Sequence, residues 1–242
     1  MEKVKTTGVS YAIPPLSNAR GLANTSVLIS WSGGKDSCLA LYEIQKAQIR
    51  VAALLTTVTR DYDRISMHGV RRELLEKQAE KLGLPLHQVP ISKDATNEEY
   101  EAKMAEAFSE YSERGIDSVV FGDLFLEDIK VYREQFLARH QMRGLFPVWK
   151  RDTSSFIKEF IELGFKAVVT CVNSKVLDKS FAGRIIDEAF LSSLPVDVDP
   201  CGENGEFHSF VFDGPIFTEA VKFSIGETVL RDSFWFRDLL PE

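Results

Sequence analysis

The feature that most constrains the fold is an apolar run that stops at two glycines and is followed at once by an amphipathic helix. Val27–Ile29 predicts a buried strand, Gly33 and Gly34 break it, and Leu39 and Tyr42 follow at helical spacing. A strand that leads through a glycine turn into a helix directs unpaired backbone N–H groups and the positive end of the helix dipole at the turn. The segment therefore predicts a binding site for a phosphate group.

The polar residues of the turn strengthen this prediction. Glycine lets the backbone approach an anion closely because it has no Cβ. The two serine hydroxyls and the lysine ammonium add donors and positive charge, while the aspartate is suited to cap the helix or to bind Mg²⁺. We therefore predict that a nucleotide binds at Ser32, Gly33, Gly34, Lys35, Asp36 and Ser37, with Asp36 as a metal ligand.

The spacing of this turn separates it from one well-known phosphate loop and relates it to another. A Walker A motif has four residues between its first glycine and its Gly-Lys pair, and this chain does not. Ser32–Ser37 instead resembles the PP-loop, Ser-Gly-Gly-x-Asp-Ser, of the N-type ATP pyrophosphatases. The resemblance implies cleavage of ATP between its α and β phosphates. The alternative is a Gly-Gly turn with ordinary helix capping, which the combination of both serines, the lysine and the aspartate disfavours.

Strand and helix patterns alternate along the following residues. Short apolar runs predict strands at 51–58, 86–91, 118–123 and 166–172, with a brief extended segment at 145–149. Amphipathic patterns between these runs predict helices at 67–82, from 96 to the glycine at 115, at 128–142 and at 153–163. This alternation predicts βαβ units and a parallel sheet.

Composition and spacing divide the chain into three parts. Residues 1–24 contain Pro14-Pro15 without periodicity and predict a loose N-terminal arm. Residues 25–145 predict the nucleotide-binding domain. Residues 146–242, where strands and turns dominate after 205, predict a smaller α+β lobe that binds substrate.

Charge and cysteine content exclude several classes of protein. The formal net charge of −7 argues against a broad electrostatic surface for nucleic acid. No apolar stretch approaches the ~18 residues of a membrane span, so we expect no membrane partner. The three cysteines show no CxxC spacing, which is typical of a reducing compartment without structural disulfides. We therefore expect a cytoplasmic protein.

The ends of the predicted strands supply further candidate residues. Ligands of open parallel sheets bind outside the carboxyl ends of the strands. This rule selects Thr56 for adenine or ribose, and Gly122 for close approach of the backbone to a ligand. It also selects Asp123, which we expect to bind substrate or a metal or to cap the turn. For Thr56 an ordinary strand-end role is equally open.

A second polar stretch follows much later in the chain. Glu203, Asn204, Glu206 and His208 lie within six residues, with two glycines, Gly202 and Gly205, among them. A hairpin turn at Asn204-Gly205 explains the glycines. It does not explain the carboxylates, the amide and the imidazole, which are groups that a polar substrate or ammonium site requires.

Together, Ser32–Ser37 and Gly202–His208 make the chain similar to the diphthine–ammonia ligase family. The resemblance spans about Val27 to Phe217 and includes further landmarks at Gly122-Asp123, Pro147–Trp149, Leu177-Asp178, Gly183-Arg184 and Asp187. It implies an α/β fold of the HUP type, a Rossmann-like parallel sheet flanked by helices, with a smaller C-terminal α+β lobe. It also implies ATP-driven amidation of a carboxylate.

The chain departs from the eukaryotic and archaeal pattern at its second motif. Asn204 replaces an inner glycine, and His208 replaces the last acid. The segment Ser66–Arg71 is more similar to the bacterial branch of the family. Because bacteria lack diphthamide, a bacterial member would amidate a different acid, and the resemblance supports the reaction type more firmly than the substrate.

These observations predict a mechanism and its partners. A small-molecule or protein-borne carboxylate attacks the α-phosphorus of ATP, with Mg²⁺ as cofactor, and ammonia then displaces AMP. Lys35 is expected to stabilise the departing pyrophosphate. Glu206 is expected to bind ammonium and take its proton, while Asp123, Glu203, Asn204 and Gly205 bind substrate and His208 relays a proton.

Two other functions and one assembly stay open. A PP-loop enzyme that thiolates tRNA would use Cys171 and Cys201 to carry sulfur. A non-catalytic ATP-binding sensor would leave the second motif without a task. The aromatic residues near the C-terminus pack either the second lobe or the interface of a homodimer.

Overall fold

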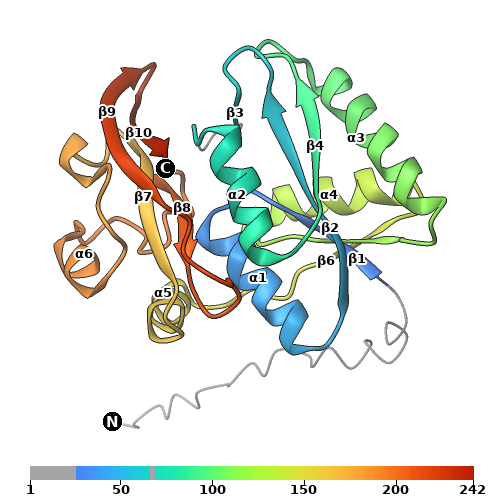
Figure 1. Ribbon diagram of the computed structural model, residues 1–242, viewed down its shortest axis with the longest axis horizontal. Coiled ribbons are helices and arrows are strands. Elements are labelled where there is room, and N and C mark those ends of the chain that lie inside the picture. The colour runs from blue at the N-terminus through green and yellow to red at the C-terminus, as the bar shows by residue number, and fades with distance from the viewer. Residues whose placement is uncertain (1–25, 66–68) are drawn as a thin grey trace, which may run out of the picture.

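A parallel sheet forms the first half of the molecule in the computed structural model, which describes residues 26–65 and 69–242 (Figure 1). The expected arm at 1–24 and Ser66–His68 lie outside the described residues. The five parallel strands run in the order β4-β2-β1-β5-β6. Their bounds are β1 Ser26–Ser30, β2 Arg50–Thr59, β4 Leu86–Ile91, β5 Ser118–Val120 and β6 Arg143–Leu145.

Four helices cover this sheet on both faces. They are α1 (Lys35–Lys46), α2 (Arg72–Leu82), α3 (Asn97–Ser112) and α4 (Glu127–Arg139). Local sequence signals set several of their ends: Thr96 caps α3 by accepting a hydrogen bond from the N–H of Glu99, and Gly83 ends α2 in the left-handed conformation with φ of 65°. The predicted α/β architecture, a parallel sheet flanked by helices, is confirmed.

The short strand β3 (Arg64–Ile65) pairs antiparallel with the last two residues of β2. It places the polar stretch after β2 beside the carboxyl edge of the sheet. The predicted helix at 67–82 therefore begins later than expected, at Arg72.

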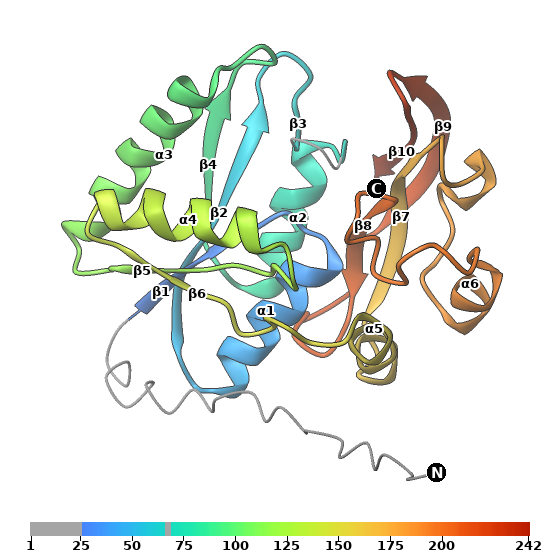
Figure 2. The same cartoon turned by 180° about the vertical axis from the view of Figure 1, so that it is seen from behind.

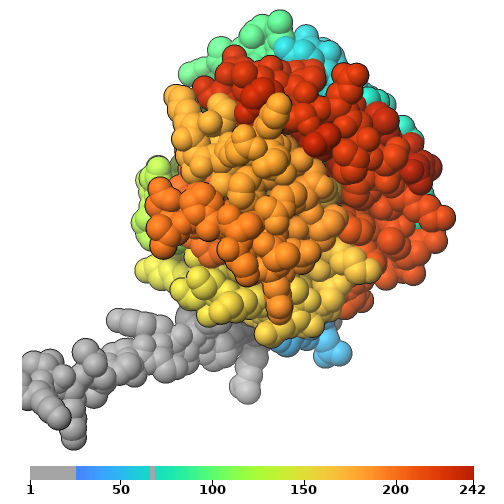
Figure 3. All heavy atoms as spheres, turned by 90° about the vertical axis from the view of Figure 1, so that its left-hand side faces the viewer, coloured from blue at the N-terminus to red at the C-terminus, as the bar shows by residue number. Residues whose placement is uncertain are grey.

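A second, antiparallel sheet forms the smaller C-terminal part, in the order β8-β7-β10-β9. Its strands are β7 (Lys166–Asn173), β8 (Phe207–Asp213), β9 (Phe223–Arg231) and β10 (Phe234–Pro241). Helices α5 (Thr153–Glu162) and α6 (Glu188–Ser193) and the 3₁₀ turn η2 (Lys179–Phe181) accompany it. Figure 2 shows the two sheets side by side from behind, and Figure 3 shows that the C-terminal part of the chain forms most of one face of the molecule.

Two expectations about this region are wrong. The strand at 166–172 forms as predicted, but as β7 it belongs to the antiparallel sheet and not to the parallel one. The extended segment expected at 145–149 is largely a turn, because strand β6 ends at Leu145 and residues 147–150 follow as a turn. Apolar runs mark buried strands, but they do not indicate which sheet a strand joins.

The hydrophobic core explains why the two sheets hold together. Helices α1 and α2 lie between them, so that Leu39 and Leu74 share one buried cluster with Phe156 and Phe210 of the C-terminal part. A second cluster, which includes Leu28 and Phe108, fills the opposite face of the parallel sheet under α3 and α4. Because one core serves both sheets, the carboxyl edge of the parallel sheet is held in a fixed position against β8.

Candidate active site

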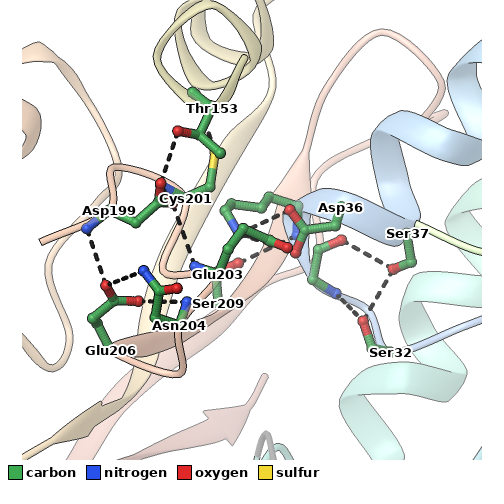
Figure 4. A network of polar contacts seen from close by, with 12 residues as sticks. Ser32, Asp36, Ser37, Thr153, Asp199, Cys201, Glu203, Asn204, Glu206 and Ser209 are labelled. Atoms are coloured by element: carbon green, nitrogen blue, oxygen red, sulfur yellow. Dashed lines mark hydrogen bonds and ion pairs between the residues drawn. The ribbon is translucent and has the colours of Figure 1, made fainter. Parts of the chain in front are cut away.

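The turn between β1 and α1 is closed by its own serines (Figure 4). The Ser32 hydroxyl accepts a hydrogen bond from the N–H of Gly34 at 3.2 Å and lies 3.2 Å from the hydroxyl of Ser37. The Ser37 hydroxyl donates to the carbonyl of Gly34 at 3.0 Å. These bonds fix the glycine turn in the shape of a cradle at the N-terminus of α1.

A buried glutamine anchors the turn from below. The side-chain amide of Gln78 donates to the carbonyl of Gly33 at 3.1 Å and to that of Val211 at 2.6 Å, and its oxygen accepts from the indole N–H of Trp31 at 2.8 Å. Gly33 has φ of +75°, and a Cβ there would lie 2.6 Å from a methyl group of Leu75. The position therefore requires glycine.

The C-terminal sheet contacts the turn directly. The N–H of Val211 donates to the carbonyl of Gly33 at 2.9 Å, and the N–H of Lys35 donates to the hydroxyl of Ser209 at 3.2 Å. Both partners belong to β8, the strand that begins in the second polar motif. The two motifs, distant in sequence, are therefore neighbours.

Lys35 is the buried cation of the site. Its ammonium lies 2.8 Å from a carboxylate oxygen of Asp36 and 4.0 Å from one of Glu203, and its side chain is only 4% exposed. Burial lowers the pKa of Lys35, but the nearby charges, Asp36 foremost, outweigh it, so the pKa is raised overall. Lys35 therefore supplies a positive charge beside the glycine turn that the sequence predicts to bind phosphate.

Glu203 is the carboxylate that faces this charge. Burial first, and then the negative charge of Asp36, raise the pKa of Glu203 to about 8 although Lys35 acts in the opposite direction. Its side chain is 11% exposed. A carboxyl group with a pKa near neutrality in a cleft is a candidate general base.

Glu206 has a different position from the one that the sequence suggested. One carboxylate oxygen accepts hydrogen bonds from the N–H of Asp199 at 3.0 Å and the side-chain amide of Asn204 at 3.1 Å, and the other accepts from the N–H of Asn204 at 2.9 Å. The residue is 4% exposed. Because its oxygens are bound within the loop, Glu206 shapes the second motif and does not face the cleft.

Asp199 completes the framework of this loop. Its carboxylate accepts hydrogen bonds from the N–H of Cys201 at 2.8 Å and from the hydroxyl of Thr153 at 2.7 Å. Figure 4 shows Asp199 and Glu206 farther from Ser32 and Ser37 than Glu203, which lies between the two groups. The hydrogen bonds of Asp199 and Glu206 therefore fix the loop that places Glu203 beside the glycine turn.

A third strand end closes the site. Asp123 follows β5, and its carboxylate lies 3.0 Å from the Nε of Arg133 on α4. Burial raises the pKa of Asp123 and Asp36 adds to this, although Arg133 opposes it. A Cβ at Gly122 would lie 2.6–2.7 Å from backbone atoms of Asp36 and Ser37, so this glycine permits close packing against α1. The expected close approach is thus to the helix that forms the cradle.

These elements surround one cleft of about 530 Å³. Residues of both motifs and of the β5 end line it: Ser32, Lys35, Asp36, Ser37, Gly122, Asp123, Glu203, Asn204, Gly205 and His208. Gly33, Gly34 and Glu206 support its wall without lining it, and Thr56 is a buried residue of β2 outside it. The sequence did not single out Phe121, Phe207, Ser209 and Phe234 as lining residues or Gln78 as an anchor. Phe207 lies within the second motif but is apolar, and the others lie outside both polar motifs.

The cleft also has carboxylates that suit a magnesium ion. Among the described residues no group of three or more histidine, cysteine or acidic side chains is arranged to hold a metal by itself. One buried carboxylate oxygen of Asp36 and one of Asp123 make no hydrogen bond, but each is ion-paired, with Lys35 at 2.8 Å and with Arg133 at 3.0 Å respectively. Mg²⁺ commonly binds one or two carboxylates together with substrate phosphates, and these two carboxylates would hold the ion in exchange for their present pairing with the two cations.

Comparison with known proteins agrees with this geometry. Residues 25–143 match the model of the diphthamide synthase N-terminal domain, and residues 152–238 match that of the diphthamide synthase C-terminal domain. The chain belongs to the diphthamide synthase family. Its two matched regions carry the glycine turn and the second motif respectively, so the cleft lies between the parts that define the family.

Several curated relatives are similar to this chain over most of its length. The chain is 27% identical to a diphthine–ammonia ligase of Danio rerio over 83% of this chain and 87% of that protein. It is 23% identical to the human diphthine–ammonia ligase over 84% of each chain. A solved structure, the U34-tRNA thiolase NcsA from Methanococcus maripaludis, superposes on 61% of this chain and 63% of its own with 15% identity and a TM-score of 0.38, a likeness too low to argue from.

The cysteines have surroundings unsuited to sulfur transfer. Cys171 and Cys201 are buried, and Cys201 donates from its Sγ to the carbonyl of Thr153 at 3.2 Å. Burial raises the pKa of Cys171 to about 12 and also raises that of Cys201. A reactive cysteine requires a lowered pKa and access to solvent, so the geometry does not favour a tRNA-thiolating enzyme.

No described helix has both the length and the apolarity to cross a bilayer.

Proposed function

We propose that this family member is an ATP-dependent ligase that adenylates a carboxylate, releases pyrophosphate and transfers ammonia to the activated acyl group. The observation that carries the proposal is that Lys35 of the glycine turn and Glu203 of the second motif lie 4.0 Å apart in one cleft. Relatives of this chain from Danio rerio and human are diphthine–ammonia ligases. A phosphate cradle and a basic carboxylate are the two groups that adenylation followed by ammonia transfer requires.

In the first step, the substrate carboxylate attacks the α-phosphorus of ATP and pyrophosphate leaves. The N–H groups at the start of α1 and the Lys35 ammonium stabilise the charge that collects on pyrophosphate. Mg²⁺, which would bind between Asp36, Asp123 and the phosphates, would supply further positive charge there. The burial of Lys35 strengthens its effect, because the dielectric around a buried charge is low.

In the second step, ammonia attacks the acyl-adenylate and AMP leaves. Glu203 takes over the role that the sequence suggested for Glu206, because Glu203 lines the cleft and Glu206 does not. A carboxyl group with a pKa of about 8 binds ammonium when ionised and accepts the proton that the attacking nitrogen must lose. Asn204 and His208 line the same cleft and position the acyl group. The buried, unpaired cysteines support the cytoplasm as the compartment.

The experiment separates the two steps. Glu203→Gln is expected to retain ATP–pyrophosphate exchange with the acid substrate within about threefold, while ammonia-dependent amide formation falls by about 10²-fold or more. Glu106→Gln, an exposed residue on α3, is the control and should affect neither reaction. Loss of exchange and of amide formation together would contradict the assignment of Glu203 to the ammonia step.

The sensor alternative has a different signature. A non-catalytic ATP-binding protein would bind ATP without turning it over under any combination of ammonium and acid. That alternative gives the Glu203 carboxyl in the cleft no task. The ligase proposal gives it one, because general bases work best when their pKa lies near the operating pH.

A further inference from the structure

A second cavity of about 460 Å³ adjoins the cleft. It lies where β2 and β4 end, with Thr59 and Lys93 on one side and β9 and β10 of the antiparallel sheet on the other. His208 and Phe234 line both cavities. Because ligands of open parallel sheets bind at the carboxyl ends of strands, both cavities lie along the same ligand-binding edge.

The second cavity has an apolar body. Its volume is in the range of small-molecule sites, which are mainly apolar with a few polar groups that fix orientation. Apolar and aromatic side chains from both sheets form much of its wall: Tyr62, Ile65, Val229, Phe234 and Phe236. A ligand here would contact residues of both the parallel sheet and the antiparallel sheet.

The charges of the cavity are positive in an acidic chain. Four cationic and two anionic side chains line it, whereas the whole chain has a formal net charge of −7. Two of the cations are already engaged: Arg64 pairs with Asp238 at 2.9 Å, and Arg237 donates to the carbonyls of Ala182 and Gly226. Their role is to hold the cavity wall.

The other two cations are available to a ligand. Lys93 and Arg231 have no ion-pair partner within the residues that the structure describes, although the carboxylate of Asp232 also lines the cavity. The Arg231 guanidinium lies over the ring of Tyr62, 5.6 Å from its centroid, which fixes its position. Two unneutralised cations beside an apolar wall are the complement of an organic anion.

We propose that this cavity binds the body of the acid that is amidated, and that this acid carries a second anionic group that Lys93 and Arg231 recognise. The inference rests on the proposed ligase function. The reacting carboxylate would extend past His208 and Phe234 into the cleft, toward Lys35 and Glu203. The substrate class is therefore an organic acid with an apolar body and at least two negative groups.

The adenosine of ATP is a poorer match for this cavity. Adenine is neutral and has no need of two cations, and the triphosphate has its own cradle at the glycine turn. If the acid occupies the second cavity, ATP can occupy the cleft at the same time, as a reaction between two substrates requires. The test therefore measures ATP affinity alongside anion affinity.

The experiment uses 8-anilinonaphthalene-1-sulfonate, an apolar aromatic anion, as the probe, with its fluorescence titrated on the intact chain. The wild-type protein is expected to bind one probe molecule, and the double variant K93Q/R231Q is expected to bind it at least tenfold more weakly. ATP affinity should stay within twofold. The matched control is Arg114→Gln, which removes an arginine that lies over Tyr111 at 5.4 Å, outside both cavities.

Three results would overturn the proposal: no probe binding to the wild type, equal binding by the double variant, or a loss of ATP affinity in the double variant. The last would assign the cavity to adenosine. Once a substrate acid is known, the double variant should raise its KM at least tenfold with little change in kcat. If the probe result is as expected but no acid supports AMP release, the anion site stands and the ligase proposal fails.

Discussion

The N–H of Lys35 donates a hydrogen bond to the hydroxyl of Ser209, 3.2 Å away, across 174 residues of sequence. This bond joins the first turn of α1 to β8, the strand that leads out of the second motif. It lies beside the contact between Val211 and Gly33, so the glycine turn proposed to hold phosphate is supported partly by the antiparallel sheet. Movement of one sheet relative to the other would therefore distort the cradle.

Gln78→Leu is expected to destabilise the fold. The change leaves the indole N–H of Trp31 and the carbonyl of Val211 buried without the bonds that Gln78 makes at 2.8 and 2.6 Å. Each unsatisfied buried group costs about 1–3 kcal/mol, so the free energy of unfolding should fall by about 2–5 kcal/mol. Urea unfolding measures this. Gln88→Leu, which loses one partly buried bond to Glu76, is the control and should change it by less than about 1 kcal/mol.

Glu203→Gln is expected to alter how stability depends on pH. The pKa of Glu203 is about 8 in the folded chain and near its ordinary value of 4.5 when unfolded. Between pH 4.5 and pH 8 the folded state binds one proton more than the unfolded state. The contribution of Glu203 to the free energy of unfolding is therefore fully present below pH 4.5 and is lost as pH rises toward 8. The variant should therefore gain stability relative to the wild type across this interval. Thermal unfolding in a pH series measures the difference in Tm between the variant and the wild type. A difference that did not change with pH would contradict the burial of this carboxyl.

Asp238→Asn is expected to show the opposite dependence. Hydrogen bonds from Arg71 first, and then the pairing with Arg64, lower the pKa of Asp238 from 3.8 to about 2. The contribution of this group is present above pH 3.8 and is lost as pH falls toward 2, and it amounts to about 1–2 kcal/mol. The advantage of the wild type over the variant, measured by urea unfolding, should shrink over that range. A constant advantage would mean that Asp238 does not hold the two sheets through its charge.

The double variant C171A/C201A is expected to keep ligase activity within about twofold. Both thiols are buried, and neither lines the cleft. Small cavities left by the lost sulfur atoms should lower stability by about 1–2 kcal/mol. Turnover of ATP at a permissive temperature measures the first effect and thermal unfolding the second. A loss of more than tenfold in turnover without unfolding would indicate that one of the two thiols takes part in the reaction.

Local pattern was enough to predict the glycine turn, because Gly33 and Lys35 follow an apolar strand and open a helix within a few residues. It was not enough to separate Glu203 from Glu206. Which of two neighbouring carboxylates faces the cleft depends on hydrogen bonds to Asp199 and Asn204 that only the folded loop reveals. Composition gave no means of distinguishing them.

Long-range pairing was likewise hidden from the sequence. β7 has the apolar pattern of a parallel-sheet strand, yet it pairs antiparallel with β8 and β10, which lie later in the chain. Ser209 and Gln78 belong to no polar motif, and their roles come from the strand and helix that carry them to the turn. The carboxyl-edge rule located the cleft, while the residues that hold it in place required the structure.

The most direct test of the central claim is the identity of the products formed from ATP. The claim is that the glycine turn and the second motif form one site that cleaves ATP between its α and β phosphates. ³¹P NMR of ATP incubated with the protein, Mg²⁺, ammonium and a mixture of organic diacids should show AMP and pyrophosphate, and Lys35→Ala should abolish both signals. Formation of ADP and phosphate by the wild type would contradict the account.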